Sequence, residues 1–199
     1  MLYYRAWREA DRVYTVYSET AGKQIVRGHG VRKLQSKLAG SLEPFAEIDL
    51  YLIAARQRPK IGGAVIRHRF KHITAQQQSW QAAHWCTQLV GDLTPEGAAD
   101  TVLYQLLYEI LAWIDQTGAH RTVLCSFACK VIRVLGYDLA AQTNQSEVIK
   151  IIQWLTSTPY QSVQKLRLTN SQWQGIVASM QRWLIQHGPA HVQANILLV

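Results

Sequence analysis

The sequence predicts an α+β protein in which a small N-terminal β-barrel, residues 1–72, is followed by an all-α helical domain, residues 73–199. Two features of the pattern predict this division. Apolar residues alternate with polar ones through roughly the first 70 residues, and from about Thr74 they recur at helical spacing. Gly-containing turns separate the short alternating runs, as is typical of a barrel.

The positive charge is confined to the first part of the chain. Residues 1–72 contain 14 Lys and Arg against 6 Asp and Glu, whereas residues 73–199 contain 7 of each sign, so the whole net charge of +8 lies in the first third. A uniform basic surface only keeps a protein in solution. A field concentrated on one module favours a polyanionic partner, because each neutralised phosphate releases condensed counterions.

Five short runs are predicted to be strands, because β-branched and aromatic residues dominate them or apolar residues alternate in them. The runs are Leu2–Trp7, Arg12–Ser18, Lys23–Gly28, residues 46–54 and Lys60–Phe70. Between the third and fourth runs lies a basic segment that contains glycines, Gly30–Pro44, in which we expect at most a short helix around Ser36–Leu42. This placement resembles an OB-fold. With so short a first run, the barrel is expected to be open along that edge unless the true N-terminus is longer.

The second part is predicted to be a helical bundle. One helix is expected to start at Thr94-Pro95 and end at Gly118, and the next to run from His120 to Leu135. Two further helices should begin at capping boxes, Asn144–Glu147 and Thr169–Gln172. The first helix carries an apolar stripe made of Val102, Leu103, Leu106, Leu107, Ile110, Leu111 and Ile114.

Cysteines and tryptophans are interpreted as packing residues. Cys86, Cys125 and Cys129 include no Cys-x-x-Cys pair, so we expect reduced, buried thiols and no metal; Cys125 and Cys129, four residues apart, are the one arrangement that also suits a metal. For the tryptophans, core packing is the default over base stacking. Those in predicted helices are Trp80, Trp85, Trp113, Trp154 and Trp173, and Trp183 is expected to follow them.

The sequence contains none of the motifs that mark common catalytic sites. It has no phosphate loop ending in Lys-Ser/Thr, no His-Glu-x-x-His and no nucleophile elbow, and Gly28-His29-Gly30 is too short for a dinucleotide fingerprint. We therefore expect a binding protein and not an enzyme. A chain without a run of about 18 apolar residues or a signal peptide is also expected to be cytoplasmic and to have no membrane contact.

The run Arg27–Lys37 is the strongest candidate for a binding segment. It holds four cations and a histidine with few apolar residues, so it is either a solvated loop or a groove that tracks a phosphate backbone. Tyr14, Tyr17, Phe45 and Tyr51 lie nearby in sequence and are either stacking faces or core. The predicted DNA-binding residues are Arg12, Lys23, Arg27, His29, Arg32, Lys33, Lys37, Arg56 and Arg58.

Several motifs in this region resemble the bacterial DNA repair protein RecO family. The segments that carry the resemblance are Glu9–Thr15, Thr20–Lys23, Arg27–Leu38 and Leu42–Phe45, with weaker agreement at Phe127–Gly136 and Gln193–Leu197. The resemblance implies an OB-fold followed by a helical domain. It also implies a recombination mediator, nucleoid-associated, that binds single- and double-stranded DNA, anneals complementary strands and helps load RecA onto coated strands.

The partners that the resemblance implies are RecR and the acidic, hydrophobic C-terminal tail of single-stranded DNA-binding protein. Such a tail needs an apolar pocket beside a cation. The candidate residues on one helix are Phe127, Lys130, Val131, Arg133 and Val134. Many members carry a four-cysteine zinc module after a Leu-Gly-Tyr step, whereas here Leu135-Gly136-Tyr137 continues without cysteine. We therefore expect neither zinc nor another cofactor. Oligomeric state does not follow from the residues.

Two other classes of function remain open at this point. A barrel of this kind also suits a scaffold that docks an acidic protein, or a module that binds RNA, because phosphate contacts do not distinguish the sugars.

Overall fold

The computed structural model describes residues 2–33, 35–36 and 38–188. Its N-terminal part is a five-stranded sheet in the order β1-β2-β3-β5-β4. The strands are β1 (Tyr3–Trp7), β2 (Asp11–Ser18), β3 (Gly22–Gly28), β4 (Ala46–Ile53) and β5 (Lys60–Arg69). Neighbouring strands are antiparallel except β3 and β5, which meet in parallel at Arg27 and Lys60. This topology confirms the predicted OB-fold and all five predicted strands.

The barrel has an apolar interior of its own. The buried residues there are Tyr14, Val16, Val26, Val31, Leu42 and Ile61. Val31 and Leu42 belong to the long connection between β3 and β4, whose one described helical turn is η1 (Ala39–Ser41). The connection is therefore anchored to the barrel at these two positions, because burying Val31 and Leu42 offsets part of the entropy lost in ordering a long loop.

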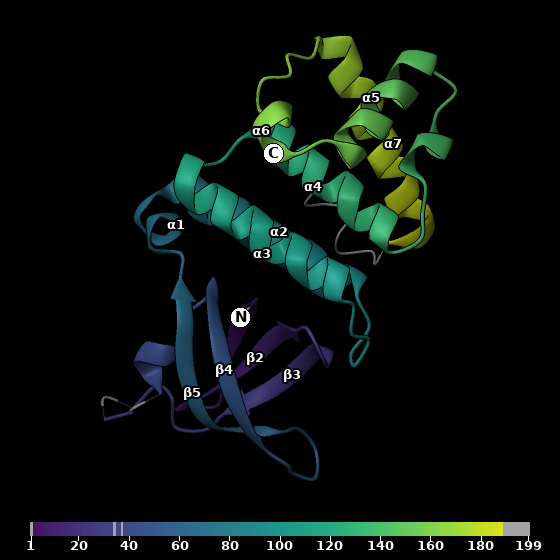
Figure 1. Cartoon of the computed structure of the whole chain (residues 1–199). Helices are drawn as coiled ribbons and strands as arrows, with labels where there is room; N and C mark the ends of the chain where they lie inside the picture. Colours follow the sequence, from purple (N-terminus) through teal and green to yellow (C-terminus); the bar gives the residue numbers. More distant parts are fainter. Residues whose placement is uncertain (1, 34, 37, 189–199) are drawn as a thin grey trace.

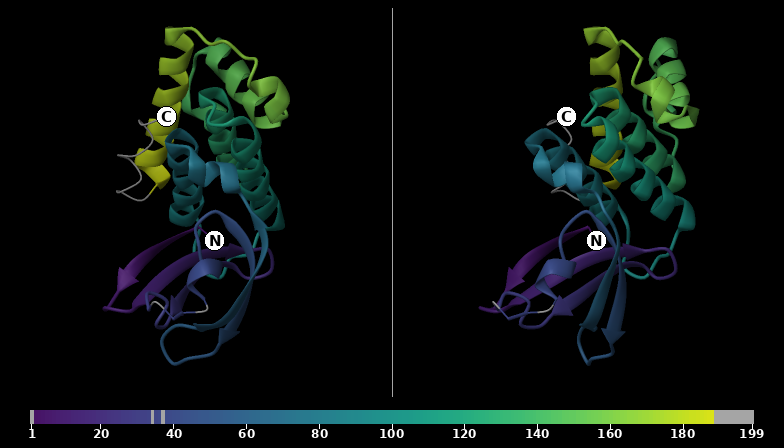
Figure 2. Two further views of the ribbon diagram at one scale, coloured as in Figure 1. Left: turned by 90° about the vertical axis from the view of Figure 1, so that its left-hand side faces the viewer. Right: turned by 60° about the vertical axis from the view of Figure 1, so that its left-hand side comes forward.

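Eight helical segments follow the barrel in the described chain, in agreement with the predicted bundle. After α1 (Lys71–Ala75) come α2 (Gln77–Leu93), α3 (Thr101–Thr117), α4 (Arg121–Val134), η2 (Leu139–Gln142), α5 (Ser146–Ser157), α6 (Tyr160–Val163) and α7 (Asn170–His187). α2 and α3 lie side by side between the barrel and the remaining helices (Figures 1 and 2). Within the described residues, no helix combines the length and apolar character that crossing a bilayer requires.

Two of the predicted helix starts are wrong. α3 begins at Thr101 and not at Thr94-Pro95, because the Asp100 carboxylate accepts the Leu103 N–H at 2.9 Å and caps the helix there, while Thr94 ends α2. Val102 consequently faces solvent and is 59% exposed. α5 begins without the Asn144–Glu147 capping box, because Glu147 accepts from Gln172 of α7 instead.

The capping box predicted at Thr169–Gln172 is confirmed at the start of α7. The three cysteines are buried, as predicted, and so is Trp183. The interpretation of all helical tryptophans as core is wrong for two of them. Trp80 and Trp154 are 41% and 39% exposed, because each lies on the solvent side of its amphipathic helix.

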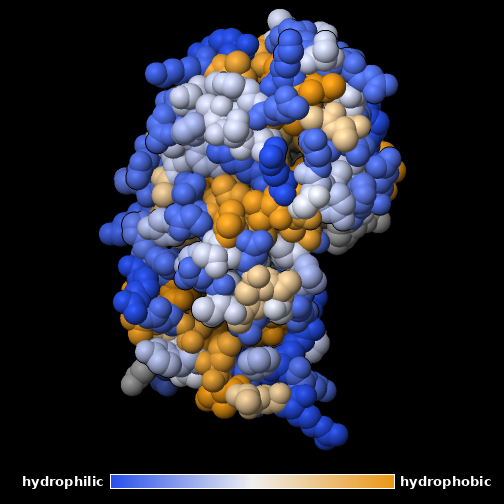
Figure 3. Space-filling model, turned by 45° about the vertical axis from the view of Figure 1, so that its right-hand side comes forward, coloured by the Kyte–Doolittle hydropathy of each residue, from blue (hydrophilic) through white to orange (hydrophobic). Residues whose placement is uncertain are grey.

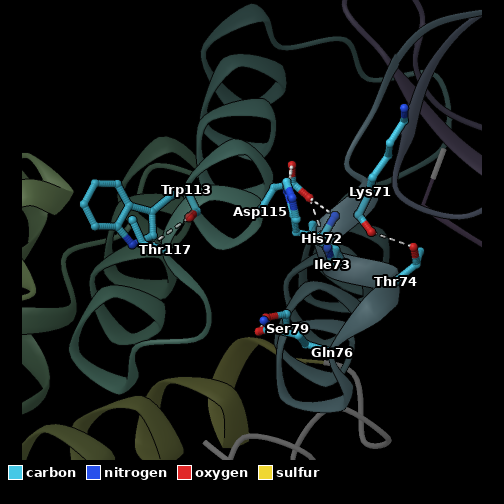
Figure 4. Close-up of polar contacts among 9 residues, drawn as sticks. All are labelled: Lys71, His72, Ile73, Thr74, Gln76, Ser79, Trp113, Asp115 and Thr117. Carbon is cyan, nitrogen blue, oxygen red and sulfur yellow. Dashed lines mark hydrogen bonds and ion pairs between the residues drawn. The ribbon is translucent and has the colours of Figure 1, made fainter.

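One continuous core joins the barrel to the helices. It includes Leu2, Tyr17, Phe45 and Phe70 from the barrel together with the apolar faces of the helices. At the junction, the Asp115 carboxylate of α3 accepts the backbone N–H groups of His72 and Ile73 at 2.7 and 3.0 Å, which satisfies the first turn of α1 (Figure 4). The boundary predicted between residues 72 and 73 falls within α1, and a division of the chain into two folding units there stays a prediction.

The tip of the β2–β3 hairpin packs closely against the loop between α2 and α3. Gly22 has a φ of +63° and sits so close to that loop that a Cβ atom would lie 2.0 Å from the Ala98 carbonyl oxygen. We expect Gly22→Ala to lower the free energy of unfolding by at least about 2 kcal/mol, since it combines a left-handed alanine with a backbone clash. Urea denaturation measures this change.

Gly97→Ala is the matched control. Gly97 also has a positive φ, +80°, but apart from its chain neighbours no atom of the described residues lies within 4 Å of the position of its Cβ. The free energy of unfolding of this variant should fall by only about 1 kcal/mol, which is the conformational cost of alanine in a left-handed conformation. Equal losses for the two variants would contradict a tight contact at Gly22.

Candidate nucleic-acid interface

Backbone hydrogen bonds tie together three connecting segments of the barrel: the β1–β2 turn, the start of the β3–β4 connection and the β4–β5 loop. The β4–β5 loop lies at the end of the barrel remote from the helices (Figure 1). The Arg27 N–H donates to the Pro59 carbonyl oxygen at 2.8 Å, which ties the end of β3 to the β4–β5 loop. The Arg32 N–H donates to the Ala10 carbonyl oxygen at 3.0 Å, which ties the β3–β4 connection to the β1–β2 turn.

Asp11 organises this end of the barrel from a buried position. Its carboxylate accepts the Gly30 N–H at 2.8 Å and the Arg27 Nε–H at 3.0 Å, and His29 Nδ1 lies 2.9 Å away. The Gly30 N–H, followed by the Arg27 guanidinium, holds the pKa of Asp11 well below its usual range. The acidic residue at the start of β2 therefore fixes the conformation of the first residues of the basic segment.

A basic cavity of about 380 Å³ lies between the β1–β2 turn and the β4–β5 loop. We call it the basic pocket. It is lined by Arg5, Trp7, Arg8, Val13, Arg27, Ala55, Arg56, Gln57, Arg58 and Lys60. Every charged side chain in this lining is a cation, and Trp7 presents an indole that is 44% exposed. Several guanidinium groups around an exposed aromatic ring suit the phosphates and bases of a single strand.

Arg8 holds an unusual backbone conformation within this pocket. Its φ is 58°, in the left-handed region that favours glycine. An arginine kept at such a position costs about 1 kcal/mol or more relative to a relaxed backbone. Strained non-glycine residues concentrate at functional sites, so this observation supports a binding role for the turn.

The structure brings some of the predicted DNA-binding residues into the pocket and places others elsewhere. Arg27, Arg56 and Arg58 line it. Arg32 and Lys33 are exposed on the adjoining connection, beside the Asp11-bound His29. Lys37 lies outside the described residues. All of these assignments to DNA stay predictions.

Two of the predicted residues have other contacts. The Lys23 ammonium donates to the Gly91 carbonyl oxygen of α2 at 2.6 Å, so it faces the helices and not the basic pocket. The Arg12 guanidinium lies 4.1 Å from the centre of the Tyr4 ring, a cation–π contact on the barrel. Of the aromatic residues with two interpretations, Tyr14, Tyr17 and Phe45 are core and only Tyr51, at 63%, is exposed.

Sequence reasoning missed Arg5, Trp7, Arg8 and Lys60. Arg5 and Trp7 are two residues apart on β1, so they share one face of that strand. That spacing was available in the sequence. It could not be connected with Arg56 and Arg58, because their proximity depends on how the β4–β5 loop folds back over the barrel end.

The predicted pocket for an acidic tail is not formed by the residues on α4 that were predicted to line it. Phe127 and Val131 are 0% exposed core residues. The Lys130 ammonium donates to the Thr158 carbonyl oxygen at 2.8 Å and lies 4.2 Å from the centre of the Tyr160 ring, and burial lowers its pKa. Val134 is packed at the edge of the core and Arg133 is exposed.

A cavity of about 650 Å³ lies instead between α2 and the start of α4, and we call it the α2 pocket. Its main aromatic wall is Trp80, which stacks on His84 with ring centres 5.0 Å apart. Burial lowers the pKa of His84, which favours the neutral ring. The cation beside the pocket is Arg121, held 4.2 Å above the Trp173 ring.

Both parts of the chain match families of known proteins. A family model described as recombination protein O N terminal matches residues 1–64, and one described as recombination protein O C terminal matches residues 78–144. A DNA repair protein RecO from Geobacter sulfurreducens is 29% identical over 134 residues, which are 67% of this chain and 55% of that protein. One from Desulforamulus reducens is 32% identical over 132 residues, 66% of this chain and 51% of that protein. The chain thus spans about half the length of the curated relatives it matches.

The depressed pKa of Asp11 predicts an acid-sensitive barrel. Because the carboxyl is harder to protonate in the folded chain, its ionised form stabilises the fold above the unfolded value of about 3.9, and that contribution is lost as the pH falls below it. Asp11→Asn cannot titrate, so its free energy of unfolding should fall less steeply than the wild-type value from about pH 4 downwards. Urea titrations at stepped pH measure both slopes; equal slopes would show that Asp11 is not the titrating group.

Proposed function

The chain belongs to the RecO family of DNA repair proteins, and we propose on this premise that it is a non-enzymatic recombination mediator whose basic pocket binds DNA. It binds single- and double-stranded DNA with little sequence preference, anneals complementary strands and, with a RecR-like protein, assists RecA loading on coated strands. The observation that carries this proposal is the convergence of Arg5, Arg8, Arg56 and Arg58 around Trp7 at the free end of the barrel.

The chemistry of the pocket supports binding without sequence selectivity. Guanidinium groups pair with phosphate oxygens, which are the same in every sequence, and an indole stacks on any base. A scaffold for an acidic protein would use the same charges without needing the exposed ring. RNA remains the closer rival, and competition between DNA and RNA oligomers of one sequence decides between them.

Removing pocket cations should weaken DNA binding in a way that salt dependence identifies. For Arg5→Ala/Arg56→Ala/Arg58→Ala we expect weaker binding to every DNA sequence and a log Kd against log salt slope reduced by up to about 0.9 per lost duplex phosphate contact. Fluorescence anisotropy at several salt concentrations measures both quantities.

The control removes the same charge from the helical part through the exposed cations Lys150, Lys165 and Arg167, each changed to Ala. Its salt slope should match the wild-type slope. Arg8→Gly is a second check, because it relieves a left-handed backbone while removing a cation. It should bind DNA more weakly without unfolding more easily. If the control and pocket variants lose equal affinity, net charge and not the pocket attracts DNA.

The α2 pocket is the better place for the acidic, apolar tail of a single-stranded DNA-binding protein. It combines apolar walls at Trp80 and Trp85 with the Arg121 guanidinium, which can receive a terminal carboxylate. The α4 residues Phe127 and Val131 offer no accessible apolar surface. This partner therefore docks on the helices while DNA occupies the barrel.

Two charge reversals test where the tail binds. With a labelled acidic, apolar peptide that ends in a free carboxylate, Arg121→Glu should weaken binding at least about tenfold, the effect of losing one charge-assisted contact. Arg133→Glu, which changes the exposed cation of the α4 face, should leave binding within about twofold. The reverse ranking in isothermal titration calorimetry would place the tail on α4.

A further inference from the structure

The barrel leaves two strand edges without a strand neighbour. Among the described residues, β4 pairs only with β5, and β1 pairs only with β2. At its N-terminal end, β1 pairs with β2 as far as Tyr3, which lies opposite Thr15. Beyond that, the Leu2 N–H donates to the Thr15 carbonyl oxygen at 3.1 Å. β2 continues to Ser18. The last three residues of β2 therefore face β4 across a gap that described strands do not fill.

A groove of about 530 Å³ occupies this gap, and we call it the seam groove. One side is formed by Val16 and Tyr17 of β2, and the other by residues 46–52 of β4. Its base against the helices is formed by Tyr104, Leu107, Tyr108 and Leu111 of α3, with Phe70. A chain inserted here would run between two strands, and its inward side chains would meet apolar surface.

The seam groove has the opposite charge to the rest of the barrel. Its charged lining residues in the described chain are Glu19, Glu47 and Asp49, all acidic, although residues 1–72 carry the whole positive excess. Asp49 is paired with Arg67 at 2.6 Å on an exposed face, and Glu47 accepts the Tyr104 hydroxyl at 2.9 Å. Burial and then the Glu47 bond raise the pKa of Tyr104 to about 12, in keeping with negative potential at this site. The charged side chains that line the groove are therefore all acidic, and Arg67 offsets part of that charge at Asp49.

The charges on the β4 edge are acidic only, and its far end is apolar and exposed. The strand contains no Pro or Lys, and its last three residues, Tyr51, Leu52 and Ile53, are 63%, 36% and 59% exposed. Figure 3 shows apolar surface, in orange, over the barrel half of the molecule on one side. Unprotected apolar edges are templates for an added strand.

We propose that the seam groove accepts an extended segment of a partner protein in which apolar residues alternate with Lys or Arg, and that this segment adds to the β4 edge as a strand. Its apolar side chains point toward the barrel interior beside Ile48 and Leu50, which already pack there. Its basic side chains meet Glu19 and Asp49. A second copy of this chain is a poor occupant, because antiparallel pairing of two β4 strands brings acidic residues together.

A pair of designed peptides tests the proposal on the full chain. The probes are blocked, labelled octapeptides of alternating Lys and Val or alternating Glu and Val, followed by anisotropy. The Lys peptide should bind at least about tenfold more tightly than the Glu peptide, an effect of opposite and like charges across an interface. Hydrogen exchange at residues 47–53 should slow when the Lys peptide is bound, because an added strand protects alternate amides.

Charge reversal within the seam groove provides the decisive variant. Glu19→Lys/Asp49→Lys should weaken binding of the Lys peptide at least tenfold, whereas Glu9→Lys/Glu96→Lys, two exposed acids elsewhere, should not. Unfolding by urea checks that both variants fold, and DNA binding at the basic pocket is scored separately. Equal affinity for the two peptides, protection at residues 54–60 in place of 47–53, or concentration-dependent dimers that displace the peptide would overturn the proposal.

Discussion

The packing of the barrel against α2 and α3 is the constraint on which the other features depend. Leu2, Tyr17, Phe45 and Phe70 belong to the same apolar core as the helices, so the barrel has one covered end and one free end. Two contacts orient the barrel on the helices: Gly22 packs against the Ala98 backbone, and the Lys23 ammonium donates to the Gly91 carbonyl oxygen. Connections at the free end are thereby left to solvent, where a long polymer can reach them.

Charge is distributed according to this geometry. The basic pocket lies at the free end, the acidic seam groove lies at the junction, and the neutral helices carry an aromatic pocket with one cation. Each surface attracts a ligand that the other two disfavour, because a phosphate backbone, a basic strand and an acidic tail differ in charge. The three proposed ligands would therefore contact different residues.

Rigidity at the free end comes from a buried acid among basic residues. Asp11 forms an ion pair with Arg27 and also contacts His29 and the Gly30 N–H. This ion pair reduces the net positive charge at the free end. In return the β3–β4 connection begins in a defined position beside the β1–β2 turn. Arginines presented from fixed backbone lose less entropy on binding than those on a mobile loop. The cations at this end thus differ in environment: Arg27 is paired with Asp11, whereas Arg5, Arg56 and Arg58 are exposed.

The sequence alone determined the strands, most of the helices and the location of the charge, because alternation, helical spacing and net charge are properties of neighbouring residues. It also indicated the family, through ordered motifs around Arg27–Leu38. Only the tertiary structure decided which cations meet. Arg5 and Arg58 are far apart in the chain and line one pocket because the β4–β5 loop folds over the end of the barrel. Lys23 instead donates to the Gly91 carbonyl oxygen, and Phe127 is buried in the core. The same holds for the seam groove, since an unpaired edge exists only once every other strand has found its neighbour.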